Sequence, residues 1–367
     1  MSADRAEAVA GAVARRELDA LLVSDLVNVR WLSGFSGSSG AAVVGAGTDG
    51  ARAFVTDFRY RTQIAVELDP TWRATIVSDP LAGAAEAVGG LVAARGTDRL
   101  RLGFDDVHLS VRAHTRLQEL MPDTVELEPA GGLIEALRAV KDPEELAAIR
   151  AATELADEAF TQVVGRGLTG RTEQAVALDL EMTMRTLGAQ GSSFPPIVAA
   201  GEHGALPHAS PRDVAIPAGT LVVVDWGARL DGYASDCTRT LATGKIDDAA
   251  REVYALVLRA QEAALAAVRP GPTGKDVDAV ARDLIAAAGH GDHFGHGLGH
   301  GVGLEVHEAP RLSKQGDEPL VTGNVVTVEP GIYLPDVVGV RIEDLVAVSA
   351  DGHEVLTGLS KALTVVG

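Results

Sequence analysis

The sequence is poor in cysteine and in positive charge. Its 367 residues include one cysteine, Cys237, so no internal disulfide can form. Because stable disulfides belong to oxidising compartments, a chain without one fits a reducing environment, and we expect a cytoplasmic protein. Lys and Arg number 32 against 51 for Asp and Glu, which gives a formal net charge of −19. A chain this acidic is not attracted to phosphate backbones or anionic lipids, so we expect no nucleic-acid or membrane partner.

Long hydrophobic runs are also missing. Apolar stretches such as 221–224 are far shorter than the roughly 20 residues that a membrane-spanning helix needs. The start of the chain carries charges throughout and lacks the apolar centre of a secretory signal, so we expect neither kind of segment. The sequence does contain 46% hydrophobic residues, enough for a sizeable core. At about 150 residues per domain, the length predicts two domains.

The first part of the chain alternates between strand-like and helix-like segments. Apolar runs of strand length lie between stretches of helical spacing, in the order 6–16, 20–23, 41–44, 53–56, 81–94 and 100–104. This alternation predicts an α/β domain over residues 1–130. The glycine-rich segment 34–40 lacks the GxGxxG spacing and the Lys-Ser/Thr pair of phosphate-binding loops. We therefore interpret it as a turn between two strands.

A breaker-rich stretch at 129–132 separates this part from the second domain, which we place at 131–367. Asp142 and Glu145 then flank Pro143 with the spacing of a capping box, which predicts the start of a helix. Further helices are predicted at 172–187, 249–268 and 274–288.

The second domain contains an internal repeat. Each copy runs from a helix to a histidine, then to an apolar strand that ends in a carboxylate, and then to a second carboxylate. The two copies are His208, Asp225 and Asp236, followed by His307, Glu329 and Glu343. This duplication predicts two pseudo-symmetric halves that bring their acids to one centre. The expected fold is an α+β domain with an internal twofold repeat.

The four acids of the repeat favour a metal site. A carboxylate that ends an apolar strand is costly to bury without a counter-charge. Four such groups side by side would raise one another's pKa values, and one or two divalent cations would remove that conflict. Taken singly, any one of these acids is better explained as a strand-end residue that pairs with an arginine or caps a turn. As a duplicated set beside many histidines, the four predict metal binding.

Five of the ten histidines crowd into residues 290–307, among alternating glycines. His296 and His300 are four residues apart, as in the HExxH helix of zinc peptidases, but the glycines disfavour a helix. They favour a strand or an extended loop whose backbone approaches a ligand closely. A period of two puts His296, Leu298 and His300 on one side. Both histidines are therefore predicted to face one site.

These segments resemble the pita-bread metallopeptidases, a family that includes prolidase, aminopeptidase P and methionine aminopeptidase. The resemblance rests on VDWGARLDGYASDCTRT (224–240), HGLGHGVGLEVHEAP (296–310), TVEPGIY (327–333) and VRIEDL (340–345). The N-terminal part is similar to the creatinase/prolidase N-terminal domain through NVRWLSGFSGSSG (28–40) and TDFRY (56–60). Methionine aminopeptidases generally lack that domain. The resemblance is therefore to the Xaa-Pro peptidase branch, and it covers essentially the whole chain.

The resemblance implies a dinuclear metal site with five ligands: Asp225, Asp236, His300, Glu329 and Glu343. Asp225 and Asp236 would hold one metal. His300 and Glu329 would hold the other, and Asp236 and Glu343 would bridge the pair. Such an oxygen-rich set favours Mn²⁺, with Co²⁺ or Fe²⁺ as substitutes, over Zn²⁺. Two metals that share a water would lower its pKa and supply hydroxide to attack the carbonyl before proline.

The catalytic residues of the family carry over as well. Glu329 matches the proton shuttle, which passes the proton of the water to the leaving nitrogen. His307 would donate to the oxyanion of the tetrahedral intermediate. His208 and His296 match the substrate-side histidines, which contact the scissile region and the proline pocket. Arg341 would hold Glu343 and the end of the substrate in place.

The implied activity is that of a metal-dependent exopeptidase that cleaves the Xaa-Pro bond, at peptide N-termini or in Xaa-Pro dipeptides. Proline lacks an N–H and has a fixed φ, so it needs a dedicated pocket. Phe194 and Pro195 are candidates for its wall, although core packing explains Phe194 equally well. The resemblance also implies a homodimer. The alternatives are a creatinase-like hydrolase and a non-catalytic binding module of the same fold. Both kinds of relative tend to have lost metal ligands, whereas this chain keeps all five. The spacing does not separate a dipeptidase from an aminopeptidase.

Overall fold

The computed structural model describes residues 2–47, 50–96 and 99–367. The chain divides into two compact units, Met1–Arg138 and Ala139–Gly367. The division follows helix α6 (Leu133–Arg138), whereas the sequence suggested a boundary at residue 130. Arg138 supplies the reason. Its buried guanidinium donates to Asn28 Oδ1 at 2.8 Å, which ties α6 to the first unit.

The first unit is built on a mixed sheet whose described strands have the order β4-β3-β2-β1-β5-β6. They are β1 (Ala20–Val23), β2 (Gly40–Gly45), β3 (Arg52–Thr56), β4 (Arg73–Ile76), β5 (Leu100–Phe104) and β6 (Val125–Pro129). Strand β1 is buried along its whole length and pairs antiparallel with β2 and parallel with β5. A sheet of this kind, with helices between its strands along the chain, is the predicted α/β architecture.

Several helices of the first unit begin at a side-chain cap. They are α1 (Ser2–Arg15), α2 (Leu26–Ser33), α3 (Arg61–Glu67), α4 (Pro80–Arg95), α5 (Val111–Leu120) and α6, with a 3₁₀ turn at Phe58–Tyr60. The side chain of Asp79 accepts N–H groups in the first turn of α4, and Pro80 follows it. The segment 34–40 links helix α2 to strand β2, so the prediction of a turn between two strands was wrong. Gly34 ends α2 with a φ of 82°, a conformation that favours glycine.

The helices of the second unit lie close to their predicted positions. They are α7 (Pro143–Gly165), α8 (Glu173–Thr186), α9 (Asp248–Ala267) and α10 (Gly274–Ala287). The capping box of α7 is present: Asp142 Oδ1 accepts Glu145 N–H at 2.8 Å, and Asp142 N–H donates to Glu145 Oε2 at 3.0 Å. These caps are local, which is why the sequence predicted them.

The strands of the second unit form two halves. The first half contains β7 (Gly191–Ser192), β8 (Ile197–Ala200), β9 (Leu221–Trp226), β10 (Ala228–Leu230), β11 (Tyr233–Ala234) and β12 (Cys237–Ala242). The second half contains β13 (Gly299–Gly301), β14 (Glu308–Leu312), β15 (Val325–Val328), β16 (Gly331–Leu334), β17 (Val338–Arg341), β18 (Asp344–Ser349) and β19 (Gly352–Val355). The antiparallel pairs β9–β12 and β15–β18 correspond. In each pair, one acid lies at the end of the first strand and another directly before the second, which confirms the repeat.

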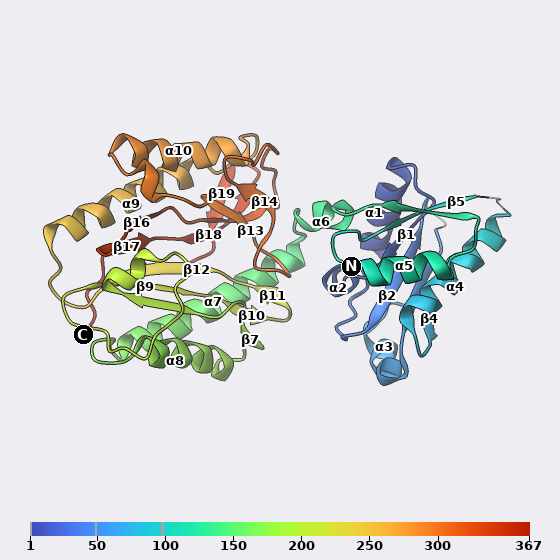
Figure 1. Ribbon diagram of the computed structural model, residues 1–367, viewed down its shortest axis with the longest axis horizontal. Helices are drawn as coiled ribbons and strands as arrows, with labels where there is room; N and C mark the ends of the chain where they lie inside the picture. The colour runs from blue at the N-terminus through green and yellow to red at the C-terminus, as the bar shows by residue number, and fades with distance from the viewer. Residues whose placement is uncertain (1, 48–49, 97–98) are drawn as a thin grey trace. The chain divides into compact units, whose positions relative to one another are not determined.

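Two apolar cores fix the halves. One joins α9 and α10 to the strands of the second half, and the other joins α7 and α8 to β8, β9 and β12. Within the second unit, α9 and α10 lie on one side of the strands and α7 and α8 on the other (Figure 1). Trp226 fills the second core, where its ring stacks on Phe160 with centroids 4.0 Å apart. This layered α+β unit with a twofold repeat is the predicted pita-bread architecture.

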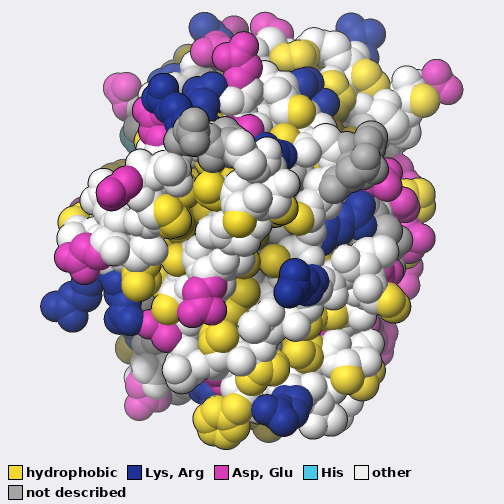
Figure 2. Space-filling view, turned by 90° about the vertical axis from the view of Figure 1, so that its right-hand side faces the viewer, with side chains coloured by type: hydrophobic (Ala, Val, Ile, Leu, Met, Phe, Trp, Pro, Cys, Tyr) yellow, Lys and Arg dark blue, Asp and Glu magenta, His cyan; other side chains and the backbone are white. Residues whose placement is uncertain are grey.

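Charged residues of both signs are dispersed over the face seen in Figure 2. On the face that Figure 2 shows, acidic and basic side chains are interspersed with apolar ones. Within the described part of the chain, none of the helices combines the length and the apolar character that crossing a bilayer requires.

Candidate active site

A cavity of about 530 Å³ lies in the second unit. This volume is in the range of small-molecule binding pockets. Its lining includes every site residue predicted from the sequence: His208, Asp225, Asp236, His296, His300, His307, Glu329, Arg341 and Glu343. Residues from both copies of the repeat therefore meet in one place.

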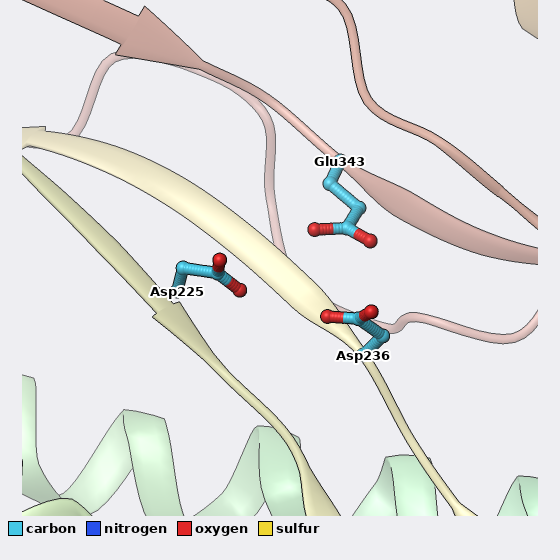
Figure 3. A group of neighbouring side chains, drawn as sticks. All are labelled: Asp225, Asp236 and Glu343. Atoms are coloured by element: carbon cyan, nitrogen blue, oxygen red, sulfur yellow. The ribbon is translucent and has the colours of Figure 1, made fainter. Parts of the chain in front are cut away.

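Three of the predicted acids form a tight buried cluster. One oxygen from each of Asp225, Asp236 and Glu343 lies within 4.8 Å of the other two. Figure 3 shows their carboxylates turned toward one another. Strand β12 connects their backbones, since Asp225 pairs with Thr238 and Glu343 N–H donates to Thr238 O at 3.1 Å. We refer to these three residues as the acid cluster.

Burial and mutual repulsion raise the pKa values of the acid cluster. For Asp236 and Glu343, burial is the larger cause, and the charges of neighbouring carboxylates raise the pKa further, well above its usual range. Burial also raises the pKa of Asp225, although Arg341 counteracts it with Nη2 at 2.6 Å from Asp225 Oδ2. Holding all three acids ionised is costly unless a further cation offsets their charge.

Two oxygens of the acid cluster show that a cation fits. Among the residues that the structure describes, no hydrogen-bond donor reaches Asp225 Oδ1 or Glu343 Oε1, although both atoms are buried. Buried carboxylate oxygens are rarely left without a partner in folded proteins. The other oxygen of each acid is satisfied, by Arg341 and by Thr238 Oγ1 at 2.7 Å. Orphaned carboxylate oxygens in such a group are suitable ligands for a hard divalent cation.

His300 and Glu329 extend the acid cluster. His300 Nε2 lies 3.2 Å from Glu329 Oε1 and 3.6 Å from Asp236 Oδ2. Its Nδ1 lies 3.1 Å from Gly301 O, and because a carbonyl only accepts, Nδ1 carries a proton. When Nε2 carries a proton it donates to Glu329, and when it does not, its lone pair faces the carboxylates as in a metal-binding histidine. Burial lowers the pKa of His300, but the hydrogen bond and charge of Glu329 raise it above its ordinary value overall.

Contrary to the prediction, Arg341 donates no hydrogen bond to Glu343. Its Nη2 donates to Asp225, its Nη1 to Tyr333 Oη at 2.8 Å, and its Nε to Thr238 Oγ1 at 3.0 Å. Thr238 occupies the space between the two side chains, since it accepts from Arg341 and donates to Glu343. Arg341 is therefore the counter-charge of Asp225 and reaches Glu343 only through a threonine.

The other histidines line the cavity in two different ways. His208 and His307 are exposed at the cavity, and partial desolvation of the His307 ring, together with the neighbouring His300, lowers the pKa of His307. His296 is half-buried, with Nδ1 2.7 Å from Gly297 O and Nε2 2.9 Å from Tyr333 Oη. Both nitrogens of His296 are thus engaged within the protein.

The glycine-rich segment is only partly a strand. Strand β13 covers Gly299–Gly301, and the residues before it are irregular. His296 and His300 both face the cavity as predicted, but Leu298 is fully buried in the core instead of lying beside them. A Cβ on Gly299 would lie 2.0 Å from a backbone oxygen of β15. The close backbone approach that the glycines allow is therefore to a neighbouring strand of the protein.

Comparison with known proteins agrees with this geometry. The model of Metallopeptidase family M24 matches residues 147–350, more than half of the chain. The chain belongs to metallopeptidase family M24. The model of the Creatinase/Prolidase N-terminal domain matches residues 5–140 of the same M24 protein.

Relatives match nearly the full length of this M24 protein. It is 40% identical to the uncharacterized peptidase YqhT of Bacillus subtilis, over 95% of this chain and 96% of that protein. An Xaa-Pro dipeptidase from Bacillus anthracis is similar in structure, with a TM-score of 0.94, 35% identity and 100% of each chain covered. An X-Pro aminopeptidase from Thermotoga maritima has a TM-score of 0.86 at 35% identity and covers 96% of this chain and 99% of its own.

Three residues of the M24 site were not predicted from the sequence. Thr238 follows Asp236 by two positions, so period-two alternation would place both side chains on the same face of a strand. That spacing could have identified Thr238. Tyr333 lies in the TVEPGIY segment, but its hydrogen bonds to His296 and Arg341 depend on the hairpin of β16 and β17. Arg311 lines the cavity from β14 and has no signal in the sequence.

Proposed function

We propose that this M24 protein is a metal-dependent exopeptidase that hydrolyses the Xaa-Pro bond, in dipeptides or at the N-terminus of peptides. The observation that carries the proposal is the acid cluster, with two orphaned oxygens, in a cavity that also exposes His208 and His307. The similar structures bear the names Xaa-Pro dipeptidase and X-Pro aminopeptidase, which supports the same substrate class here.

Five side chains would hold two divalent cations: Asp225, Asp236, His300, Glu329 and Glu343. The acid cluster on one side and the His300–Glu329 pair on the other, with Asp236 beside both, support this division. Four carboxylates and one imidazole are hard ligands, so we propose Mn²⁺, with Co²⁺ or Fe²⁺ as substitutes and Zn²⁺ as less suitable. Such cations supply Lewis acidity and lower the pKa of water.

Glu329 is the residue proposed to move the proton. Burial alone would raise the pKa of Glu329, but the hydrogen bond and charge of His300 lower it below the usual value. Thr327 Oγ1 also donates to Glu329 Oε1 at 3.0 Å and fixes the carboxylate. An ionised carboxylate in this position can accept a proton from the attacking water and return it to the leaving proline nitrogen.

His307 and His208 are proposed to face the substrate carbonyl. Both rings are exposed in the cavity, and the lowered pKa of His307 favours a neutral ring at neutral pH. A neutral imidazole N–H can stabilise the oxyanion of the tetrahedral intermediate. His296 is proposed to line the substrate side with its ring, because its nitrogens are bonded to Gly297 and Tyr333.

An apolar wall suits the proline ring. Phe194, Pro195, Pro196 and Ile197 line one part of the cavity, and their side chains offer no hydrogen-bonding groups. A tertiary Xaa-Pro amide has no N–H to satisfy, so an apolar surface meets it without leaving a polar group unpaired. A secondary amide at the same place would lose the partner of its N–H.

Arg311 is relevant to the length of peptide that the site accepts. Its exposed guanidinium lines the cavity and has no ion-pair partner among the described residues. In an Xaa-Pro dipeptide, the C-terminal carboxylate follows directly on the proline ring. A guanidinium in the same cavity as the proline wall can bind that carboxylate with two parallel hydrogen bonds. We therefore favour dipeptides over longer peptides as substrates.

Two further properties belong to the proposal. The resemblance suggests a homodimer, which sedimentation of the purified protein tests. The lone thiol of Cys237, which is buried, fits a cytoplasmic protein. The creatinase-like and non-catalytic alternatives are not favoured, because all five ligand residues line the same cavity.

The proposed activity is tested with purified protein, freed of metal by a chelator and reloaded with Mn²⁺. Hydrolysis of an Xaa-Pro dipeptide, an Xaa-Pro-Yaa tripeptide and an Xaa-Ala dipeptide is then compared. We expect cleavage of the Xaa-Pro substrates alone, lost with the metal and restored by it. Full activity in excess chelator without detectable metal would refute metal dependence, and equal cleavage of Xaa-Ala would refute proline specificity.

A further inference from the structure

Residues 200–212 form one wall of the cavity with little secondary structure of their own. After β8, the segment makes a 3₁₀ turn at Gly201–Ala205 and then runs without regular structure to Arg212. Its cavity-lining residues are Pro207, His208, Ala209, Ser210 and Pro211. We call this segment the His208 wall. Because no strand ladder holds it beyond β8, other contacts must fix its position.

One buried carboxylate binds both ends of the His208 wall. Glu173, the first residue of helix α8, is 1% exposed. Its Oε1 accepts Ala200 N–H at 3.0 Å, where the wall begins. Its Oε2 accepts Arg212 N–H at 2.9 Å, where the wall ends. The two ends are thus fixed relative to a single side chain.

Side chains of the wall close around the same carboxylate. Arg212 donates through Nε to Glu173 Oε2 at 3.1 Å and through Nη2 to Glu173 Oε1 at 3.0 Å. His203 Nδ1 lies 2.9 Å from Glu173 Oε2. A carboxylate suits this place because both of its oxygens only accept, whereas an amide would turn an N–H toward one group of donors.

Arg341 links the middle of the wall to the acid cluster. Arg341 Nη1 donates to Pro207 O at 3.1 Å, and its Nη2 donates to Asp225 Oδ2 at 2.6 Å. At the helix end, Gln174 N–H donates to Arg212 O at 3.1 Å, which adds a backbone link to α8. Hydrogen bonds to Glu173 therefore hold the two ends of the wall, and a hydrogen bond from Arg341 holds its centre.

We propose that Glu173 is a positioning residue that sets the place of His208 relative to the acid cluster. Glu173 itself does not line the cavity, so it acts through the wall. The inference rests on the proposed function in one respect, namely that the wall contacts the peptide. The hydrogen bonds from the wall to Glu173 and Arg341 are present whatever reaction the site catalyses.

The variant Glu173→Gln tests the proposal with almost no change of shape. Its amide has a single accepting oxygen, so one end of the wall loses its acceptor, and Arg212 loses its charged partner. A small displacement of substrate-binding groups is enough to slow catalysis, and we expect kcat/KM for an Xaa-Pro dipeptide to fall by about 10- to 100-fold. Metal content should stay at the wild-type level, because no proposed ligand is touched.

Asp179→Asn is the matched control. Asp179 lies on the same helix and accepts from Arg171 Nη2 at 2.7 Å, but its partners Arg166, Arg171 and Thr183 are outside the wall. This change also removes a charge from a carboxylate–arginine pair, and kcat/KM should stay near the wild-type value. A loss in D179N as large as that in E173Q would overturn the positioning role in favour of general destabilisation of α8.

A double-mutant cycle with His208→Ala separates positioning from general damage. If Glu173 acts through His208, E173Q should lower the activity of H208A by only about twofold or less, because the group it positions is already gone. Full additivity of the two losses in kcat/KM would overturn the proposal.

Hydrogen exchange supplies a readout that needs no activity. Amides of residues 200–212 should exchange faster in E173Q than in the wild type and remain unchanged in D179N; unchanged exchange in E173Q would overturn the proposal. Should E173Q fail to fold, Arg212→Met carries the same expectations with a smaller loss, since the Arg212 side chain is 41% exposed. If the wild type does not cleave Xaa-Pro peptides, the proposed function fails, and the exchange experiment still decides the role of Glu173.

Discussion

Replacing Arg341 with methionine should destabilise the metal-free protein far more than the metal-loaded protein. Arg341 is buried, and its Nη2 lies 2.6 Å from Asp225 Oδ2. It is the counter-charge of Asp225 when no metal is bound, because Asp236 and Glu343 add only negative charge. A divalent cation would neutralise the same carboxylates and make the guanidinium less important for stability.

The magnitude follows from the contacts of Arg341. Removing one partner of a buried ion pair costs about 3–5 kcal/mol, because the other charge stays buried and unpaired. The hydrogen bonds to Tyr333 Oη and Pro207 O contribute about 1 kcal/mol each, with or without metal. We expect a loss of unfolding free energy of about 5–7 kcal/mol in metal-free protein at pH 8 and about 2 kcal/mol with metal. The metal-free loss should shrink at lower pH, because the pKa of Asp225 is already raised by burial and a proton then neutralises it.

Urea unfolding of the wild type, R341M and R341K, in excess chelator and in saturating Mn²⁺, measures these free energies. Lysine keeps the charge but not the planar set of donors, so R341K should recover most of the loss that is specific to metal-free protein. An R341M loss of the same size with and without metal would refute the role of Arg341 as the counter-charge of the acid cluster.

Four further outcomes are expected. Glu329→Gln should lower kcat for Xaa-Pro hydrolysis by about 10²- to 10⁴-fold with metal retained, as measured by kinetics and elemental analysis; a near-normal kcat would contradict its shuttle role. His300→Ala should lower the metal-to-protein ratio in elemental analysis, and an unchanged ratio would exclude it as a ligand. Arg311→Ala should raise KM for an Xaa-Pro dipeptide by about tenfold or more and change an Xaa-Pro-Yaa tripeptide little, since one charge-assisted contact is lost; equal effects on both would contradict carboxylate binding. Burial raises the pKa of Asp105 from 3.8 to about 6, so the folded protein binds the extra proton and stability falls as pH rises through this window, by up to about 3 kcal/mol. Hydrogen exchange of the β1 and β5 amides measures this stability at each pH. Asp105→Asn should remove the fall of stability with rising pH, and a retained fall would refute the assignment.

Much of the fold was predictable because its signals are local. The start of α7 follows from Asp142, Pro143 and Glu145, which contact one another within a single turn. Strands β1 and β5 were predicted with their observed bounds because each is a short apolar run. The structure divides after α6, one helix beyond the boundary that the sequence suggested. The hydrogen bond that joins α6 to the first unit links Arg138 to Asn28, which are 110 positions apart.

The residues of the site were predictable for a different reason. The duplicated pattern of a histidine, a strand-end acid and a second acid is visible along the chain, and the resemblance to a peptidase family assigns each member a role. The structure places all nine predicted residues around one cavity. Their proposed roles as ligands and catalysts follow from chemistry and are tested by the variants above.

By itself, the sequence with its family resemblance identified nine residues that line the cavity, since strand ends and repeats are visible along the chain, but it missed Thr238, Tyr333 and Arg311. Only the tertiary structure decided how these residues are held. Arg341 contacts Asp225 across 116 positions, and Glu173 contacts Arg212 across 39. A side chain several bonds long can reach many partners, and which one it meets depends on the packing of whole strands and helices. Periodicity along the chain carries no information about that choice.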